Sequence, residues 1–532
     1  MTTTLERIAP FTNETIRTFS DPADIASLQA ALERARAAFG QHYPVVIGGQ
    51  SHETAGSIAS HNPAHPAQVV GTVGSASLEQ ATLAVETAAR VFQKWKKVAP
   101  AERAGYLFRA AEAVRRRRDD FNALLVLEVG KSWVEADADT AEAIDFLEFY
   151  AREALRYAAP PPLTPLAGED NRLSYIPLGV GVVIPPWNFA FAIMAGMTTA
   201  ALVAGNTVVL KPSSDAPVIA AAFVQLLHEV GLPPGVVNFV PGSGRTIGDA
   251  IVSHAKTRFI AFTGSKEVGL HINELASKTQ PGQIWIKRVI AEMGGKDSIV
   301  VAADADLDAA ADGIVASAYG FGGQKCSACS RAIVEASVYD ALERKIAERV
   351  AKLSVGDPAE RGVYMGPVIN EAALKTMLRY VEKGLAEGGR LVAGGKRGSG
   401  DGYFLEPTVI ADVAPKATIA QEEIFGPVLA LIKADDYSQA LDIANNTEFG
   451  LTGAVYSRDE AKLERARDEF HVGNLYFNRK CTGAMVGGHP FGGFNMSGTD
   501  SKAGGYDYLL LFTQAKMVSK NIGGGNGKAG GE

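Results

Sequence analysis

The segment GVGVVIPPWNFAFAIMAGMTTAALVAGNTVVLKPSS, residues 179–214, carries the strongest indication of the fold. Its apolar runs 180–184 and 207–211 are short and rich in valine, as buried strands are, and the small apolar run 190–203 has the length of a helix. The same alternation continues, with strands expected at 236–240 and 259–263 and helices at 217–230, 246–253 and 268–277. Strands that alternate with helices at this spacing predict an α/β fold built on a doubly wound parallel sheet.

Two further regions flank this sheet along the chain. Upstream, apolar spacing typical of helices is found at 24–39, 78–97, 101–122 and 137–157, and β-rich runs predict strands at 43–48 and 68–73. Downstream, a second alternating region spans 298–478, with helices expected at 306–319, 336–352, 371–387 and 438–445 and a strand at 332–335. The proline-rich stretch 158–165 ends the helical pattern and marks a crossing between lobes.

Composition and charge exclude several classes of protein. At 532 residues, 47% hydrophobic and 21% charged, the chain is typical of a globular enzyme with about three or four domain-sized units. A net charge of −7 argues against nucleic acid as a partner. The apolar run 189–205 is shorter than the roughly 20 residues that span a bilayer, and residues 1–14 lack the apolar core of a signal peptide. With three cysteines and no disulfide pattern, these features predict a cytoplasmic protein without a membrane partner.

The segment GFGGQKCSACSR, residues 320–331, places two cysteines among glycines. Glycines let the backbone approach a ligand closely, and a thiol presented in this way can be a nucleophile if a neighbour lowers its pKa or takes its proton. Cys326 and Cys329 also form a CxxC pair, so a redox dithiol, half of a metal site and inert buried thiols are the alternatives. Because a metal site needs about four ligands and no histidine lies near the pair in sequence, we favour the nucleophile and expect no metal.

Two other motifs carry residues suited to assist a nucleophile. Glu292, in the motif AEMGGK, is a candidate base, and Asn188, in IPPWNF, offers an amide donor suited to an oxyanion. Asn188, Lys211, Gly242 and Gly264 each come just after the end of a strand. Because ligands bind parallel sheets at the carboxyl ends of the strands, one ligand could contact all four residues.

Three other features have more than one interpretation. FTGSKEVG, residues 262–269, opens a helix after a glycine turn, so its free N–H groups favour a phosphate, although a plain turn explains it equally well. Lys211 suits ribose hydroxyls but could be a surface lysine. The basic run 115–118 would point in several directions on a helix, so we expect a solvated helix face there and no anion site.

Taken in order, short motifs resemble those of the aldehyde dehydrogenase superfamily over about residues 45–515. They are PWNF (186–189), KPS (211–213), FTGS (262–265), EMGGK (292–296), GQKCS (323–327), EEIFGP (422–427) and PFGG (490–493). Within the superfamily, residues 320–331 and 471–499 resemble the L-glutamate γ-semialdehyde (1-pyrroline-5-carboxylate) dehydrogenases of proline breakdown. The resemblance implies a doubly wound cofactor domain, a second α/β catalytic domain and a small β arm for oligomerisation.

The resemblance also implies a covalent reaction with NAD. The Cys326 thiolate would attack the aldehyde carbon, and the Asn188 amide and the Cys326 backbone N–H would hold the oxyanion. The tetrahedral adduct would pass hydride to the nicotinamide, because hydride leaves such an adduct more readily than it leaves a planar aldehyde. Glu292 would deprotonate the water that cleaves the thioester.

The residues implied to bind the cofactor are Ile184, Pro185, Trp187, Lys211, Ser213, Ser214, Gly242, Phe262, Thr263, Gly264, Ser265, Val268, Met293, Glu423 and Phe425. Many NAD-specific members carry glutamate where this chain has Ser214, and serine does not repel a 2′-phosphate, so we expect NAD with NADP also accepted. The residues implied to bind the substrate are Phe189, Ser327, Gly483, Ala484 and Phe491. Among these, the Ser327 hydroxyl and the backbone N–H groups near Gly483 and Ala484 would hold a substrate carboxylate. Cys329, Cys481 and His489 depart from the family pattern.

The expected organisation follows the superfamily. It comprises an N-terminal helical segment (1–45), an NAD(P)-binding domain (46–157 and 179–290), a catalytic domain (291–480), an oligomerisation arm with the substrate-anchor region (158–178 and 481–520) and a disordered tail (521–532). We expect a homo-oligomer, a dimer or higher, in which residues 509–519 form a strand that pairs with another subunit. The chain is too short to include a proline-oxidising barrel, so a separate proline dehydrogenase is the expected functional partner.

Two alternative functions remain. A dehydrogenase for another semialdehyde, such as succinate semialdehyde, would be expected to hold its carboxylate with a basic side chain. A non-catalytic protein on this fold is the other alternative, and Cys326, Glu292 and Asn188 speak against it because all three reactive groups are present.

Overall fold

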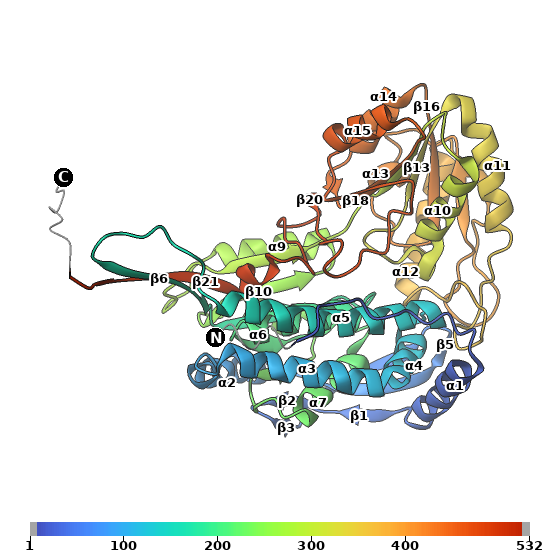
Figure 1. Ribbon diagram of the computed structural model, residues 1–532. Helices are drawn as coiled ribbons and strands as arrows, with labels where there is room; N and C mark the ends of the chain where they lie inside the picture. The colour runs from blue at the N-terminus through green and yellow to red at the C-terminus, as the bar shows by residue number, and fades with distance from the viewer. Residues whose placement is uncertain (1–7, 524–532) are drawn as a thin grey trace.

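The computed structural model describes residues 8–523. It has two lobes, each built on a seven-stranded sheet, and an arm that projects away from both lobes (Figure 1). Most of the predicted tail 521–532 and the first seven residues of the predicted N-terminal segment lie outside the described residues. No helix within residues 8–523 has both the length and the apolar character that a membrane crossing requires.

The first lobe contains the predicted parallel sheet, in the order β11-β10-β7-β8-β9-β2-β3. Its parallel strands are β7 (Val180–Ile184), β8 (Thr207–Leu210), β9 (Val237–Phe239), β10 (Thr257–Thr263) and β11 (Arg288–Glu292), and antiparallel β2 (Val45–Ile47) and β3 (Gln50–His52) extend it. The helices between these strands are α6 (Ala192–Val203), α7 (Pro217–Glu229), α8 (Asp249–Ser253) and α9 (Lys266–Ser277). The α/β prediction is therefore confirmed, and α6, whose residues are nearly all buried, is a core helix.

The second lobe has its own sheet, in the order β14-β15-β16-β13-β12-β18-β19. The strands are β12 (Ser298–Val301), β13 (Arg331–Glu335), β14 (Arg390–Ala393), β15 (Thr408–Ala411), β16 (Val428–Ala434), β18 (Thr452–Tyr456) and β19 (Asn474–Phe477), and only the β14–β15 pairing is antiparallel among these described strands. The helices are α10 (Leu307–Tyr319), α11 (Tyr339–Val350), α12 (Glu371–Ala386), α13 (Thr418–Gln421), α14 (Tyr437–Asn445) and α15 (Glu460–Glu469). The Asp306 side chain caps α10 by accepting hydrogen bonds from two backbone N–H groups.

Helices pack against both faces of the first sheet. The N-terminal elements are α1 (Pro22–Ala37), β1 (Gln41–Tyr43), β4 (Gly56–Asn62), β5 (His65–Ser75), α2 (Leu78–Trp95), α3 (Pro100–Arg116), α4 (Arg118–Val129) and α5 (Trp133–Ala158). Two predicted elements are each divided in two. The strand predicted at 43–48 breaks at Pro44, which has no N–H for a sheet, and the helix predicted at 101–122 breaks at Arg117, whose backbone is not helical.

The arm consists of β6 (Glu169–Pro177) and β21 (Thr513–Asn521), which pair with each other in an antiparallel ribbon (Figure 1). Residues 509–519 were predicted as one strand, but the segment Tyr508–Phe512 is a 3-10 helix, because its apolar side chains turn inward and are largely buried. Within the chain the partner of β21 is β6, so the pairing of this segment with another subunit stays a prediction.

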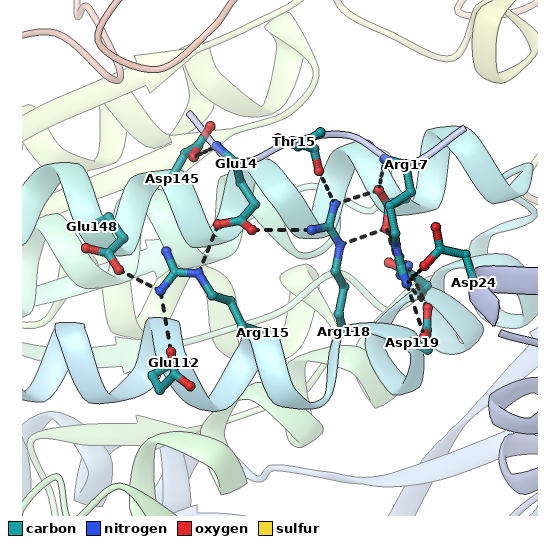
Figure 2. A network of polar contacts seen from close by, with 12 residues as sticks. Glu14, Thr15, Arg17, Asp24, Glu112, Arg115, Arg118, Asp119, Asp145 and Glu148 are labelled. Atoms are coloured by element: carbon teal, nitrogen blue, oxygen red, sulfur yellow. Dashed lines mark hydrogen bonds and ion pairs between the residues drawn. The ribbon is translucent and has the colours of Figure 1, made fainter. Parts of the chain in front are cut away.

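The basic run 115–118 is not the solvated helix face that we predicted. Arg115 and Arg118 both form ion pairs with Glu14 of the N-terminal segment, and Arg118 also pairs with the buried Asp137 at 2.6 Å (Figure 2). Arg116 does remain largely exposed, and Arg117 is partly exposed. Sequence periodicity could not show this network, because its acidic partners come from a separate segment that lies across the helices.

Candidate active site

Two hollows meet at the boundary between the lobes. A cleft of about 880 Å³ opens at the carboxyl ends of β7, β8 and β10, and a smaller, mainly apolar cavity of about 110 Å³ lies beyond it. Phe262, Thr263 and Cys326 line both hollows. A molecule in the cleft and another in the cavity would therefore both reach the Cys326 thiol.

The cleft brings together nearly all of the residues predicted for the cofactor. Those that line it are Ile184, Pro185, Trp187, Lys211, Ser213, Ser214, Phe262, Thr263, Gly264, Ser265, Val268, Met293, Glu423 and Phe425. Gly242 is the exception. It is buried, and a Cβ there would lie 2.6 Å from the Ile247 side chain, while Gly244 lines the cleft; a contact of Gly242 with the cofactor stays a prediction.

The polar end of the cleft lies after β8. Lys211 is buried, which rules out the surface-lysine interpretation, and this burial lowers its pKa to about 8. Asp215 lines the same part of the cleft, and its carboxylate accepts a hydrogen bond of 3.1 Å from Asn370 of the second lobe. We did not single out Asp215 from the sequence. It places a carboxylate next to Ser214, where the usual glutamate is missing.

The turn before α9 also lines the cleft. The Ser265 side chain caps the helix by accepting a hydrogen bond from the Val268 N–H, and Gly264 has no room for a side chain because a Cβ would lie 2.6 Å from the Phe262 ring. Glu423 lies on the opposite side, where it accepts a hydrogen bond of 3.1 Å from the Gly295 N–H, and burial raises its pKa to about 7. The cleft thus offers a helix N-terminus, a buried lysine and a buried carboxyl group, which fits a dinucleotide.

The loop that carries Cys326 has an unusual backbone. Phe321, Gly322 and Gly323 all have positive φ, and a Cβ on Gly323 would lie 2.4 Å from the carbonyl oxygen of Gly426. Glycine is therefore required where this loop crosses the second lobe. Asn188 of the first lobe donates a hydrogen bond of 3.1 Å to the carbonyl oxygen of Gln324, so the predicted oxyanion donor and the thiol loop are held together.

Glu292 ends β11 and lines the cavity together with Cys326. Burial raises the pKa of Glu292 well above its ordinary value, while Lys502, the Gly493 N–H and Ser501 act in the opposite direction. Burial also raises the pKa of the Cys326 thiol, and the negative charge of Glu292 adds to this effect. A protonated thiol next to a carboxyl group is a nucleophile that must lose its proton when the substrate arrives.

All five residues predicted for the substrate line the cavity: Phe189, Ser327, Gly483, Ala484 and Phe491. The backbone N–H groups of Gly483 and Ala484 have no hydrogen-bond acceptor among the described residues. The cavity lining contains no lysine and no arginine within residues 8–523. An anionic group in this cavity would therefore meet free backbone donors and the Ser327 hydroxyl instead of a basic side chain.

The other two thiols lie away from the cavity. Cys329 and Cys481 are buried in the core of the second lobe, where each Sγ donates a hydrogen bond of 3.4 Å to a backbone carbonyl. All three cysteines are free, and the described residues contain no cluster of three His, Cys, Asp or Glu side chains that could hold a metal. These positions favour Cys326 as the nucleophile over a redox or metal-binding role for the CxxC pair.

Comparisons with known proteins agree with this geometry. The model of the aldehyde dehydrogenase family matches residues 50–518. The chain belongs to the aldehyde dehydrogenase family. It is 58% identical to the 1-pyrroline-5-carboxylate dehydrogenase of Geobacillus thermodenitrificans over 96% of this chain and 99% of that protein.

Solved structures of this family superpose closely. A 1-pyrroline-5-carboxylate dehydrogenase from Thermus with bound NAD has a TM-score of 0.95 and 51% identity, and the match covers 97% of this chain and 100% of that one. Proline utilization A from Bdellovibrio bacteriovorus, at 44% identity, also has a TM-score of 0.95, and the match covers 96% of this chain and 53% of that protein.

Several lining residues of this family member were missed by sequence reasoning. In the cavity they are Glu142, Phe146, Tyr150, Ile193, Gly196, Met197, Ile290, Ser501, Ala503 and Tyr508, and in the cleft they include Glu267, Tyr380, Glu422, Glu448 and Phe449. Glu142 stands out, because it is the one acidic side chain besides Glu292 on the described cavity wall, and burial raises its pKa to about 8. It lies within a long helix, and no motif in the sequence distinguishes it from the other acidic residues of that helix.

Proposed function

We propose that this chain oxidises L-glutamate γ-semialdehyde, formed from 1-pyrroline-5-carboxylate, to L-glutamate with NAD, the second step of proline catabolism. The observation that carries the proposal is the meeting of the two hollows at Cys326, with free backbone donors and Ser327 at the cavity wall. The relatives that match nearly the whole chain are named for this activity.

The reaction has two halves, and each half uses different residues. In the first, the Cys326 sulfur adds to the aldehyde carbon as its proton leaves, and the Asn188 amide stabilises the negative charge on the oxygen. NAD bound in the cleft supplies the hydride acceptor. In the second half, Glu292 takes a proton from water, which adds to the thioester carbon, and the acid and the Cys326 thiol are released.

The cavity also suits the two charged groups of the substrate. A carboxylate fits the free N–H groups of Gly483 and Ala484 and the Ser327 hydroxyl, and burial without such donors would be costly. An ammonium group fits Glu142, because a nearby cation would offset the burial that now raises its pKa. A substrate with both groups, such as L-glutamate γ-semialdehyde, therefore uses both ends of this wall.

Loss of the carboxylate donors tests this assignment. We expect Ser327→Ala and Ala484→Pro, the second of which removes one backbone N–H, to raise KM for L-glutamate γ-semialdehyde by roughly 10- to 150-fold, the equivalent of about 1.5–3 kcal/mol for a charge-assisted hydrogen bond. A simple aldehyde of the same length is the control, and its kcat/KM should change little. The measurement is kcat/KM for both aldehydes, with succinate semialdehyde as a third substrate. Equal losses for all three, or a wild-type preference for succinate semialdehyde, would contradict the proposal.

Cofactor choice depends on the pocket after β8. We expect Ser214→Glu to weaken NADP by about 1–4 kcal/mol and to leave NAD almost unchanged, because a carboxylate close to a 2′-phosphate repels it. The wild type should accept NADP less well than NAD, since Asp215 already lines this part of the cleft. The measurement is the KM for NAD and for NADP in the wild type and in Ser214→Glu. A similar loss for NAD would place residue 214 away from the ribose.

We also propose that the chain forms a homo-oligomer. Ile284 and Ile286 are 85% and 88% exposed, and such large apolar side chains are usually covered by a partner when they occur together. Light scattering would give the subunit number, and a monomer would contradict the proposal.

The cytoplasmic location, the domain boundaries and a separate proline dehydrogenase as functional partner stay predictions.

A further inference from the structure

Lys502 lies behind the wall of the substrate cavity and not in it. Its neighbours Ser501 and Ala503 line the cavity, while its own ammonium donates hydrogen bonds to the carbonyl oxygens of Gly473 at 2.7 Å and Gly492 at 2.6 Å. A lysine that is bound to two carbonyls is fixed in place. Its charge is therefore held at one point of the second lobe.

The Glu292 carboxylate lies close to the same segment. A Cβ built on Gly492 would be 3.3 Å from Oε2 of Glu292, so the carboxylate and the Lys502 ammonium both lie next to Gly492. The end of β11 is also joined to this segment, because the Met293 N–H donates to the Ser497 carbonyl at 2.8 Å. Lys502 and Glu292 are thus both held beside Gly492, and no direct ion pair joins them among the described residues.

Besides Lys502, two neutral donors, the Gly493 N–H and the Ser501 side chain, favour the negative charge of Glu292, and the remaining neighbours oppose it. Asp297 is an anion, and Cys326 and Tyr508 are titratable groups whose pKa values are themselves raised by the charge of Glu292. Burial opposes ionisation as well, and Lys502 is the strongest influence in the opposite direction. Without the charge of Lys502 the pKa of Glu292 would rise further, so less of this carboxyl group would be ionised and able to act as a base.

We propose that Lys502 is a positioning residue for the hydrolytic half of the reaction, whose fixed charge keeps Glu292 available as a base. This inference rests on the proposed function. The separation matters, since a direct ion pair would occupy the oxygens that must receive a proton from water. An ammonium bound to Gly473 and Gly492 acts through its field and leaves the carboxylate free.

The test is the pH dependence of thioester hydrolysis in Lys502→Gln. Glutamine keeps an N–H donor for the carbonyls of Gly473 and Gly492 but carries no charge. We expect the acidic limb of the kcat profile to move up by about one pH unit, so that kcat at neutral pH falls about tenfold. The pre-steady-state burst of reduced cofactor should keep its amplitude and rate. Lys502→Arg should restore the wild-type profile, and Lys278→Gln, which removes an exposed charge far from the cavity, should not change it.

Two results would overturn the inference: an unshifted profile in the glutamine variant, or a fall in the burst equal to the fall in kcat. Lys502→Met, which has a side chain of similar length and no charge, replaces the glutamine variant if that protein does not fold, with the same expected shift. A simple aldehyde is run beside L-glutamate γ-semialdehyde. Because Glu292 hydrolyses either thioester, the shift must appear with both substrates, so an error in the substrate assignment does not affect this test.

Discussion

Replacing Cys326 by alanine is expected to lower kcat by on the order of 10⁴-fold or more, because the hydride donor is an adduct that cannot form without the sulfur. Cys326 is the one thiol that lines both the cleft and the cavity among the described residues. The measurement is the rate of NAD reduction with L-glutamate γ-semialdehyde. Binding of NAD should remain, since the cofactor cleft is built from other residues, and this separates lost chemistry from lost folding.

The matched control is Cys329→Ala. This thiol is 1% exposed, packs in the core of the second lobe and donates to the carbonyl oxygen of Arg331. Its loss leaves a small cavity and should cost about 1 kcal/mol of folding stability while most of the activity remains. If Cys329→Ala were inactive and Cys326→Ala active, the assignment of the nucleophile would be wrong.

Replacing Glu292 by glutamine is expected to lower steady-state kcat by roughly 10²- to 10⁴-fold, because general-base catalysis of this size is lost. The effect should fall on hydrolysis more than on acylation. Rapid mixing with NAD should then show a burst of reduced cofactor followed by a slow steady state. Intact-mass measurement should detect the acyl-enzyme on Cys326 during the slow phase.

The same experiment decides which proton Glu292 takes. Burial and the charge of Glu292 both raise the pKa of the Cys326 thiol, so this carboxyl group is placed to receive either the thiol proton or a water proton. A burst that disappears in Glu292→Gln would show that Glu292 mainly activates the thiol. In that case Lys502→Gln would slow acylation too, contrary to the profile expected above.

The sequence alone was enough to predict the parallel strands β7 to β10 of the first sheet, whereas the roles of the reactive residues stay predictions. The run 180–184 and residues 208–210 contain no polar side chain, which is typical of strands buried on both faces, so the local sequence was enough to identify these strands. Asn188, Lys211 and Glu292 come directly after or at the end of such strands, and parallel strands bring their carboxyl ends to one edge. The resemblance in short motifs supplied the roles of these residues and of Cys326.

Only the tertiary structure showed which charged residues surround the site. Glu142, Asp215 and Lys502 carry no local signal, since an acidic or basic residue on a helix or loop is usually exposed. They matter because folding partly buries them at the cofactor cleft or at the substrate cavity, next to residues from other segments of the chain. At Gly242, local spacing suggested a ligand, and the structure shows close packing against Ile247. Strand and helix patterns are local properties, whereas burial and the electrostatic field of a buried charge depend on every segment that packs around it.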